Sequence, residues 1–237
     1  MGSFFSLEGP FYKVGEVIAD IMLVGILWLL CCLPIVTIGA STTSAFYVMT
    51  KKVSKRGSYV TREFFASFKT NFVKATKLWL ILLLAVGIVV WGIYVNLVNA
   101  EIMGDMGTII LPIQMVVCAE LAMVTFFAFP MLSRFDMKTK EILKTSFFMA
   151  NKHFFASISA IILAALLVFI TLEAFPPLIL IDGGIFAYIT SFTFVKIFRK
   201  YKPELDRDPL ELEQVLLEIS EQAEKKAAKK TARAKKG

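Results

Sequence analysis

The sequence has few of the residue types on which enzyme and metal chemistry depends. It holds one histidine, His153, and three cysteines, Cys31, Cys32 and Cys118, which lie inside apolar runs at spacings that match no metal site. An odd number of cysteines within apolar runs also argues against a disulfide framework. The chain contains no Walker-type phosphate loop and no GxSxG, HExxH or CxxC motif. These absences predict a non-enzymatic protein with no metal or cofactor.

Charged residues are also scarce for a soluble protein. Only 19% of the 237 residues are charged, whereas 57% are hydrophobic and the mean hydropathy is +0.70. A soluble domain of this composition would have too little polar surface to cover itself. Apolar residues form long runs between polar blocks and do not alternate as they would in a membrane barrel. The sequence therefore predicts an all-α, multi-pass protein of the cell membrane.

Five apolar runs match the length of about 20 residues that crosses a bilayer. They cover residues 14–33, 78–98, 109–129, 154–172 and 178–198. We expect the third run to end at Pro130, and the fifth to be interrupted at Asp182-Gly183-Gly184. A further segment, residues 38–53, is short and half polar, which favours an interfacial or re-entrant helix; a sixth crossing is the alternative.

The distribution of basic residues predicts which connections face the cytoplasm. The connection before the second run contains one acid, Glu63, and eight basic residues, namely Lys51, Lys52, Lys55, Arg56, Arg62, Lys69, Lys74 and Lys77. Such loops stay on the cytoplasmic side. The connection at residues 99–108 carries two acids and no base, so it belongs outside. With five spans the N-terminus is expected outside and the C-terminus in the cytoplasm, whereas a sixth crossing at residues 38–53 would move the N-terminus to the cytoplasm.

Aromatic residues recur at helical spacing within the first basic connection. The residues concerned are Phe64, Phe65, Phe68 and Phe72, with Arg62 and Lys69 beside them. This pattern predicts an amphipathic helix on the inner membrane surface within residues 58–77, and residues 136–153 form a second basic segment of this kind. We expect both segments to contact membrane lipids or a protein partner.

The net charge of +7 comes from the C-terminal end alone. The last 13 residues contain seven bases and no acid, so the remainder of the chain is neutral and no nucleic-acid-binding domain is expected. Asp208-Pro209, with Glu211 following, is a typical helix start. The sequence thus predicts a membrane domain at residues 1–202 and a cytoplasmic charged helix with a polybasic tail at residues 203–237.

Four polar side chains within the spans form the candidate intramembrane polar site. They are Glu120, Asp182, Gln114 and Asp20. Glu120 is near the centre of its run, where an ionisable group is costly unless it faces a cavity or a partner. The alternative interpretation of each residue is a buried hydrogen bond that fixes helix packing.

Three stretches of the chain resemble the YesL family of bacterial membrane proteins, a domain of unknown function. They are Gly9-Pro10-Phe11, the run Trp28-Leu-Leu-Cys-Cys-Leu-Pro-Ile-Val-Thr-Ile-Gly-Ala40, and Phe64 to Phe72 with Ala75-Thr76. The resemblance extends over residues 5–200, although members commonly carry an asparagine where this chain has Gly25. It implies an association with carbohydrate uptake in Gram-positive bacteria, particularly with sugar ABC importers, and it transfers no active site or substrate.

Three functional hypotheses follow from these patterns. The first is a non-enzymatic accessory protein that partners the permease subunits of a sugar ABC importer. The second is a small transporter or channel that works through Glu120 and Asp182. The third is a membrane sensor or regulator that acts through the C-terminal helix. The sequence leaves the solute and the oligomeric state open.

Overall fold

Helices make up every regular element that the structure describes. This computed structural model describes residues 10–54, 59–173 and 175–201. Five of its helices are long and apolar enough to cross a membrane, which confirms the predicted all-α multi-pass architecture. The chain divides into two units, Met1–Val195 and Lys196–Gly237, and the helix packing below is that of the first. The predicted C-terminal helix and polybasic tail lie outside the described residues.

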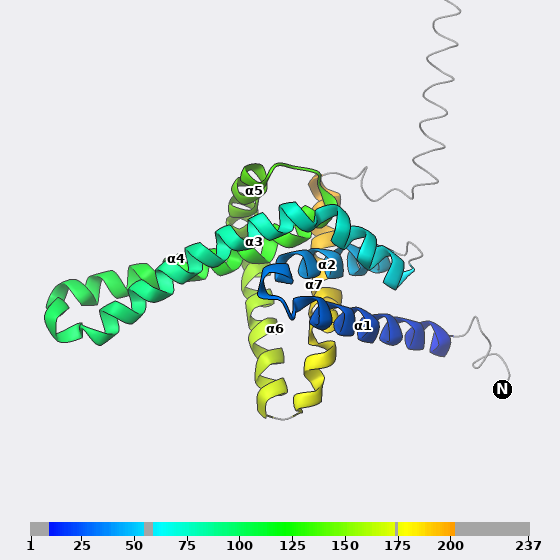
Figure 1. Ribbon diagram of the computed structural model, residues 1–237, viewed down its shortest axis with the longest axis horizontal. Helices are drawn as coiled ribbons and strands as arrows, with labels where there is room; N and C mark the ends of the chain where they lie inside the picture. The colour runs from blue at the N-terminus through cyan, green and yellow to red at the C-terminus, as the bar shows by residue number, and fades with distance from the viewer. Residues whose placement is uncertain (1–9, 55–58, 174, 202–237) are drawn as a thin grey trace, which may run out of the picture. The chain divides into compact units, whose positions relative to one another are not determined.

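The chain begins with a helical hairpin. α1 (Pro10–Cys32) ends as predicted, and the 3-10 turn η1 (Ile35–Thr37) leads into α2 (Ile38–Val53), which lies beside α1 (Figure 1). Pro34 is extended and cannot continue a helix. The Thr37 hydroxyl oxygen lies 2.6 Å from the carbonyl oxygen of Cys31 and 2.7 Å from that of Pro34, so its one hydrogen is shared between them at the reversal after α1.

The short helix α2 is enclosed by other helices. Ten of its sixteen residues are buried, and it packs against α1, α3 and α4. Its hydroxyl groups donate to carbonyls one turn earlier, as in Thr43 to Gly39 (2.8 Å) and Thr50 to Phe46 (2.6 Å), which satisfies them in an apolar interior. A helix lying flat on the membrane surface would expose one face. This burial argues against the interfacial interpretation of residues 38–53 and leaves the re-entrant helix and the sixth crossing as the two alternatives.

The predicted amphipathic helix and second span form one continuous helix, α3 (Val60–Val98). The expectation of two separate elements at residues 58–77 and 78–98 was wrong, because no glycine or proline interrupts the chain between Val60 and Val86. At 1.5 Å per residue the helix is about 58 Å long, roughly twice the hydrocarbon thickness of a bilayer. The basic first half of α3 therefore extends past the membrane core.

The fourth helix, α4 (Ala100–Arg134), returns beside α3 (Figure 1). It includes most of the predicted outside connection, with a kink at Gly104, whose positive φ of 50° suits glycine. The predicted end at Pro130 was wrong, since the helix continues through this buried proline to Arg134. A proline costs one backbone hydrogen bond, and membrane helices tolerate it where neighbouring helices pack around it.

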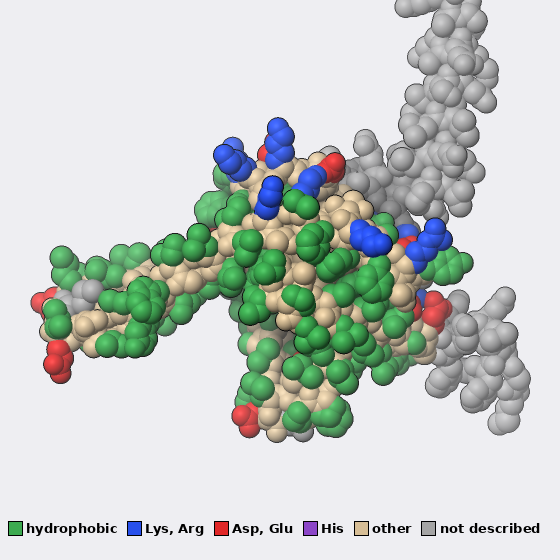
Figure 2. Space-filling model, in the orientation of Figure 1, with side chains coloured by type: hydrophobic (Ala, Val, Ile, Leu, Met, Phe, Trp, Pro, Cys, Tyr) green, Lys and Arg blue, Asp and Glu red, His purple; other side chains and the backbone are tan. Residues whose placement is uncertain are grey.

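The remaining helices are α5 (Thr139–Lys152), α6 (Phe154–Glu173) and α7 (Ile179–Tyr201), with the 3-10 turn η2 (Pro176–Leu178) before α7. α7 runs unbroken through Gly183 and Gly184, so the predicted interruption there was wrong. Acidic side chains lie at the tip of the α3–α4 hairpin, whereas basic ones gather over α5 and the first turns of α3 (Figure 2).

Candidate functional site

Asp20 belongs to an ion-pair cluster between α1 and α2. Lys52 Nζ, at the end of α2, lies 2.5 Å from both Glu16 Oε1 and Asp20 Oδ2 of α1. The side chains of Lys52 and Asp20 are only 16% and 18% exposed, so neighbouring groups shield much of the pair from solvent. Asp20 therefore fixes the register of the α1–α2 hairpin.

Glu120 is held by a residue of α5. Asn151 Nδ2 donates to Glu120 Oε1 at 2.7 Å and also to the carbonyl of Phe147, which orients the amide. Glu120 is itself half-buried on α4. The contact ties the end of α5 to the middle of α4, so a polar partner satisfies the carboxyl group at that depth.

Gln114 packs between α3 and α4. A Cβ atom at Gly92 of α3 would lie 2.8 Å from Gln114 Nε2, so the glycine provides the room that this side chain occupies. Nearby, Asn96 Nδ2 donates to the carbonyl of Gly107 at 3.2 Å. These contacts make Gln114 part of the packing of the α3–α4 hairpin.

Asp182 lies in the first turn of α7, where the helix dipole favours an acid. Its Oδ2 atom accepts a hydrogen bond of 2.6 Å from the Thr171 hydroxyl of α6. Its Oδ1 atom is buried and has no hydrogen-bond partner among the described residues. Asp182 is thus the one member of the predicted polar site that keeps a free acceptor beside a cavity.

The two glycines after Asp182 set the contact between α7 and α1. A Cβ atom at Gly184 would collide with the carbonyl oxygen of Ile21, and one at Gly183 would collide with the Trp28 ring. On the α1 side, a Cβ atom at Gly25 would lie 2.6 Å from the Ile181 Cα atom. Glycines on both helices therefore let the backbones touch, as small residues do in membrane proteins.

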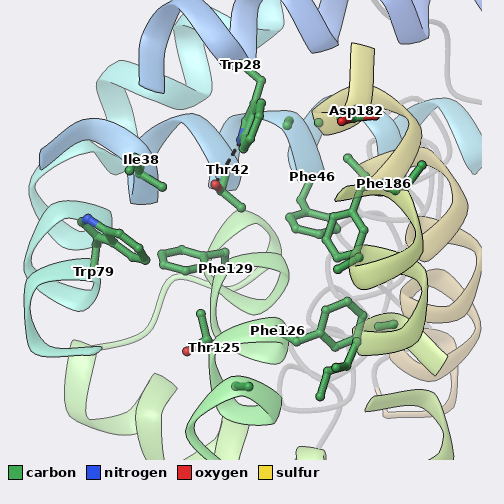
Figure 3. Close-up of a pocket in the computed structure, with 18 of the residues that line it drawn as sticks. Trp28, Ile38, Thr42, Phe46, Trp79, Thr125, Phe126, Phe129, Asp182 and Phe186 are labelled. Atoms are coloured by element: carbon green, nitrogen blue, oxygen red, sulfur yellow. Dashed lines mark hydrogen bonds between the residues drawn. The ribbon is translucent and has the colours of Figure 1, made fainter. Parts of the chain in front are cut away.

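An apolar cavity of about 570 Å³ lies among α1, α2, α3, α4, α6 and α7. Figure 3 shows Trp79 and Phe129 on one side of it and Phe126 and Phe186 on the other. The indole of Trp28 donates to the Thr42 hydroxyl at 3.1 Å, drawn as the dashed line. Of the four residues predicted to form the polar site, Asp182 is the one that lines this cavity.

The aromatic and basic residues of the predicted inner-surface segment divide between core and surface. Phe64 is fully buried, whereas Phe65 and Phe72 are exposed on the same helix and Phe68 lies between them in burial. The Phe68 ring contacts those of Phe64 and Phe72, with centroids 6.5 and 5.5 Å apart. The two cations of this set, Arg62 and Lys69, are both exposed.

The structure therefore disperses the four predicted polar residues. The buried Oε1 atom of Gln114 has no hydrogen-bond partner among the described residues. Asp20, Glu120 and Asp182 are each held by a side chain of another helix, and none of these partners, Lys52, Asn151 and Thr171, had been identified from the sequence. One of them carried a signal, because Glu16 and Lys52 each lie 18 residues from Pro34 and so face each other once the chain reverses there. The cavity left no pattern in the sequence, since its lining comes from six helices.

The next feature is the set of side chains that could bind a metal ion, within residues 10–54, 59–173 and 175–201. No three histidine, cysteine or acidic side chains of this part of the chain come together in a way that could hold a metal ion. The three cysteines are free thiols.

Part of the chain matches the model of a known protein family. Residues 21–93 match the model of a family described as "Protein of unknown function, DUF624". The match covers the second half of α1, all of α2 and most of α3, which is under a third of the chain. No curated protein and no solved structure matches the chain.

Proposed function

We propose that the chain is a YesL-type membrane protein, the family to which the DUF624 description applies, and that it serves carbohydrate uptake as a non-enzymatic accessory protein. Its partner on this proposal is a permease subunit of a sugar ABC importer. Support comes from the family match, which covers both the Trp28–Ala40 run and the aromatic segment of α3. Glu120 and Asp182 lie on different helices and each binds its own partner, Asn151 and Thr171. A transport path that uses both acids is therefore less well supported than the accessory role.

The observation that carries the proposal is an unpartnered aromatic surface in the first half of α3. Phe65, Phe72 and Val73 are exposed there, next to the exposed cation Lys69. Phe147 and Phe148 are likewise exposed on α5. Aromatic residues are enriched where proteins bind one another, and exposed apolar patches often mark such sites. We call Phe65, Phe72 and Val73 the α3 surface.

Substitution of the α3 surface should weaken capture of the importer without unfolding the protein. We expect the double substitution Phe65→Ser and Phe72→Ser to reduce co-purification of sugar-importer permeases in mild detergent by at least about tenfold, because interface aromatics each contribute on the order of 1–2 kcal/mol. The substitution Phe155→Ser removes an even more exposed aromatic, 87% against 40% for Phe65 and 37% for Phe72, from the start of α6 and serves as the control. Permeases that are absent from the wild-type eluate, or that are retained equally by both variants, would contradict the proposal.

The ion pairs of Lys52 also support the topology in which residues 38–53 cross the membrane. Lys52 follows directly on Lys51 at the start of the basic connection, and it contacts the first turns of α1 through Glu16 and Asp20. If that connection is cytoplasmic, the start of α1 is cytoplasmic as well. On this proposal the N-terminus and the C-terminus both face the cytoplasm.

Cysteine accessibility distinguishes the two topologies. In a variant in which Cys31, Cys32 and Cys118 are replaced by alanine, we expect a cysteine at Ser3 to resist a membrane-impermeant maleimide in intact cells and to react after the cells are opened. A cysteine at Asp105, in the acidic connection between α3 and α4, should react in intact cells and is the control. Labelling of both cysteines in intact cells would show that the N-terminus is outside and would contradict the crossing of residues 38–53.

A further inference from the structure

The floor of the cavity is apolar and closed. Phe46, Leu82 and Ala187 line it and are almost completely buried. Two hydroxyl groups also line the cavity, and both have partners: Thr42 accepts from Trp28, and Thr125 donates to the carbonyl of Leu121 at 2.7 Å. The buried Oδ1 atom of Asp182 is the polar group at this site without a partner in the described chain.

The mouth of the cavity is apolar as well. The lining includes Leu83 of α3, and Ile161 and Val168 of α6, and these three side chains are exposed, Val168 by 55%. They lie within the two most hydrophobic of the candidate spans. Exposed apolar side chains within membrane spans face hydrocarbon. The exposed part of the cavity lining, on α3 and α6, is therefore suited to contact with lipid.

These features exclude one class of ligand and fit another. A sugar or other polyol would bring many hydroxyl groups into a site that offers a single free acceptor, and burying unpaired polar groups is costly. The volume of about 570 Å³ falls within the range of roughly 300–1,000 Å³ found for small-molecule sites. A chain of methylene groups that ends in one hydrogen-bond donor satisfies both the walls and Asp182.

We propose that this cavity binds a bilayer lipid, with an acyl chain among the apolar walls and a head group that donates a hydrogen bond to Asp182 Oδ1. The head group carries an N–H donor, such as the ammonium of phosphatidylethanolamine. Thr171 holds the other carboxyl oxygen and so fixes the direction in which Oδ1 points. This binding site is independent of the proposed partner surface on α3.

The first test places a quencher on the acyl chain. Trp28 and Trp79 line the cavity, whereas Trp91 is exposed elsewhere on α3, so a Trp91→Phe variant reports on the cavity. In vesicles of phosphatidylethanolamine and phosphatidylcholine with brominated acyl chains, we expect quenching of this fluorescence. Ala164→Phe fills the cavity and should abolish the quenching of Trp28 and Trp79 by an acyl chain bound inside it. The adjacent Ala165→Phe points away from the cavity, since Ala165 is exposed and does not line it, and should change nothing.

A second variant replaces Ala164→Phe if that protein does not fold. Ala122→Leu narrows the cavity from α4 and is read in the same way, with folding checked by gel filtration. Equal quenching in the filling variants and in Ala165→Phe overturns the acyl-chain site.

The second test addresses the head group. Asp182→Asn keeps an acceptor for Thr171 but replaces the free oxygen with an N–H donor. In native mass spectrometry of the purified protein, we expect the wild type to bind phosphatidylethanolamine more tightly than phosphatidylcholine, whose head group has no donor. We expect Asp182→Asn to lower the affinity for phosphatidylethanolamine by about tenfold, the effect of losing a hydrogen bond to a charged group, and to leave phosphatidylcholine unchanged. Equal affinities for the two lipids in the wild type, or equal losses in the variant, overturn the assignment of Asp182.

Discussion

Replacing Gly184 with alanine is expected to destabilise the protein by about 3 kcal/mol, the upper end of the usual cost of overpacking. The new Cβ atom would overlap the carbonyl oxygen of Ile21 and lie 3.0 Å from the amide nitrogen of Gly25. Both obstacles are backbone atoms, so no side-chain rotation can relieve the overlap, and α7 must move away from α1. Thermal unfolding in mild detergent, followed by gel filtration of the heated samples, measures the loss.

A second glycine provides the control. Gly87 lies within α3, and a Cβ atom there would meet nothing within 4 Å. Gly87→Ala should therefore raise the stability by up to about 1 kcal/mol, because alanine is the better helix former. A Gly184→Ala protein that melts no earlier than Gly87→Ala would show that α1 and α7 do not touch at this position.

Replacing Lys52 with methionine is expected to cost about 2 kcal/mol, between the cost of breaking a buried ion pair and that of breaking an exposed one. Methionine keeps the length and apolar stem of the side chain, so the loss reports mainly on the charge. Without Lys52, the carboxylate of Asp20, which is 18% exposed, loses its cation and lies near that of Glu16, which is 53% exposed. Removing one partner of a partly buried ion pair destabilises the fold because the remaining charge is uncompensated. The midpoint of thermal unfolding in detergent should fall accordingly.

Two further variants separate this effect from a general loss of charge. Lys74→Met breaks the ion pair with Asp136, which is 91% exposed, and should cost less than about 1 kcal/mol. The triple variant Lys52→Met with Glu16→Gln and Asp20→Asn removes all three charges and should regain much of the lost stability. A triple variant as unstable as Lys52→Met alone would show that the charges at this position do not matter.

The sequence was informative where a local rule decides the structure. Helix α1 ends within one residue of the expected position because Pro34 cannot continue it, and α2 has the expected bounds because the chain restarts after that proline. The rule failed at Pro130, where the same residue type lies inside a helix and is enclosed by its neighbours. A proline fixes its own conformation and removes one donor, but whether the helix ends there depends on what surrounds it.

The candidate site was less accessible to sequence reasoning, for a related reason. Asp182-Gly183-Gly184 has the composition of a broken helix, yet the glycines serve the approach of α1, which lies more than 150 residues earlier in the chain. Likewise, nothing near Glu120 in sequence indicates Asn151 as its partner. Pairings between distant segments follow from the packing of whole helices, and a single sequence does not contain them in a local form.

The enclosure of α2 also bears on how the chain enters the membrane. A helix of sixteen residues that is rich in hydroxyl groups and carries two lysines in its last turn is a poor substrate for insertion on its own, since it is shorter than the about 20 apolar residues that cross a bilayer. The acids of α1 offset one of those lysines only when both helices are present. We therefore expect α1 and α2 to leave the translocon together as a hairpin. The more hydrophobic α1 would then drive insertion of the less hydrophobic α2, and α3 and α4 would pack around α2 afterwards.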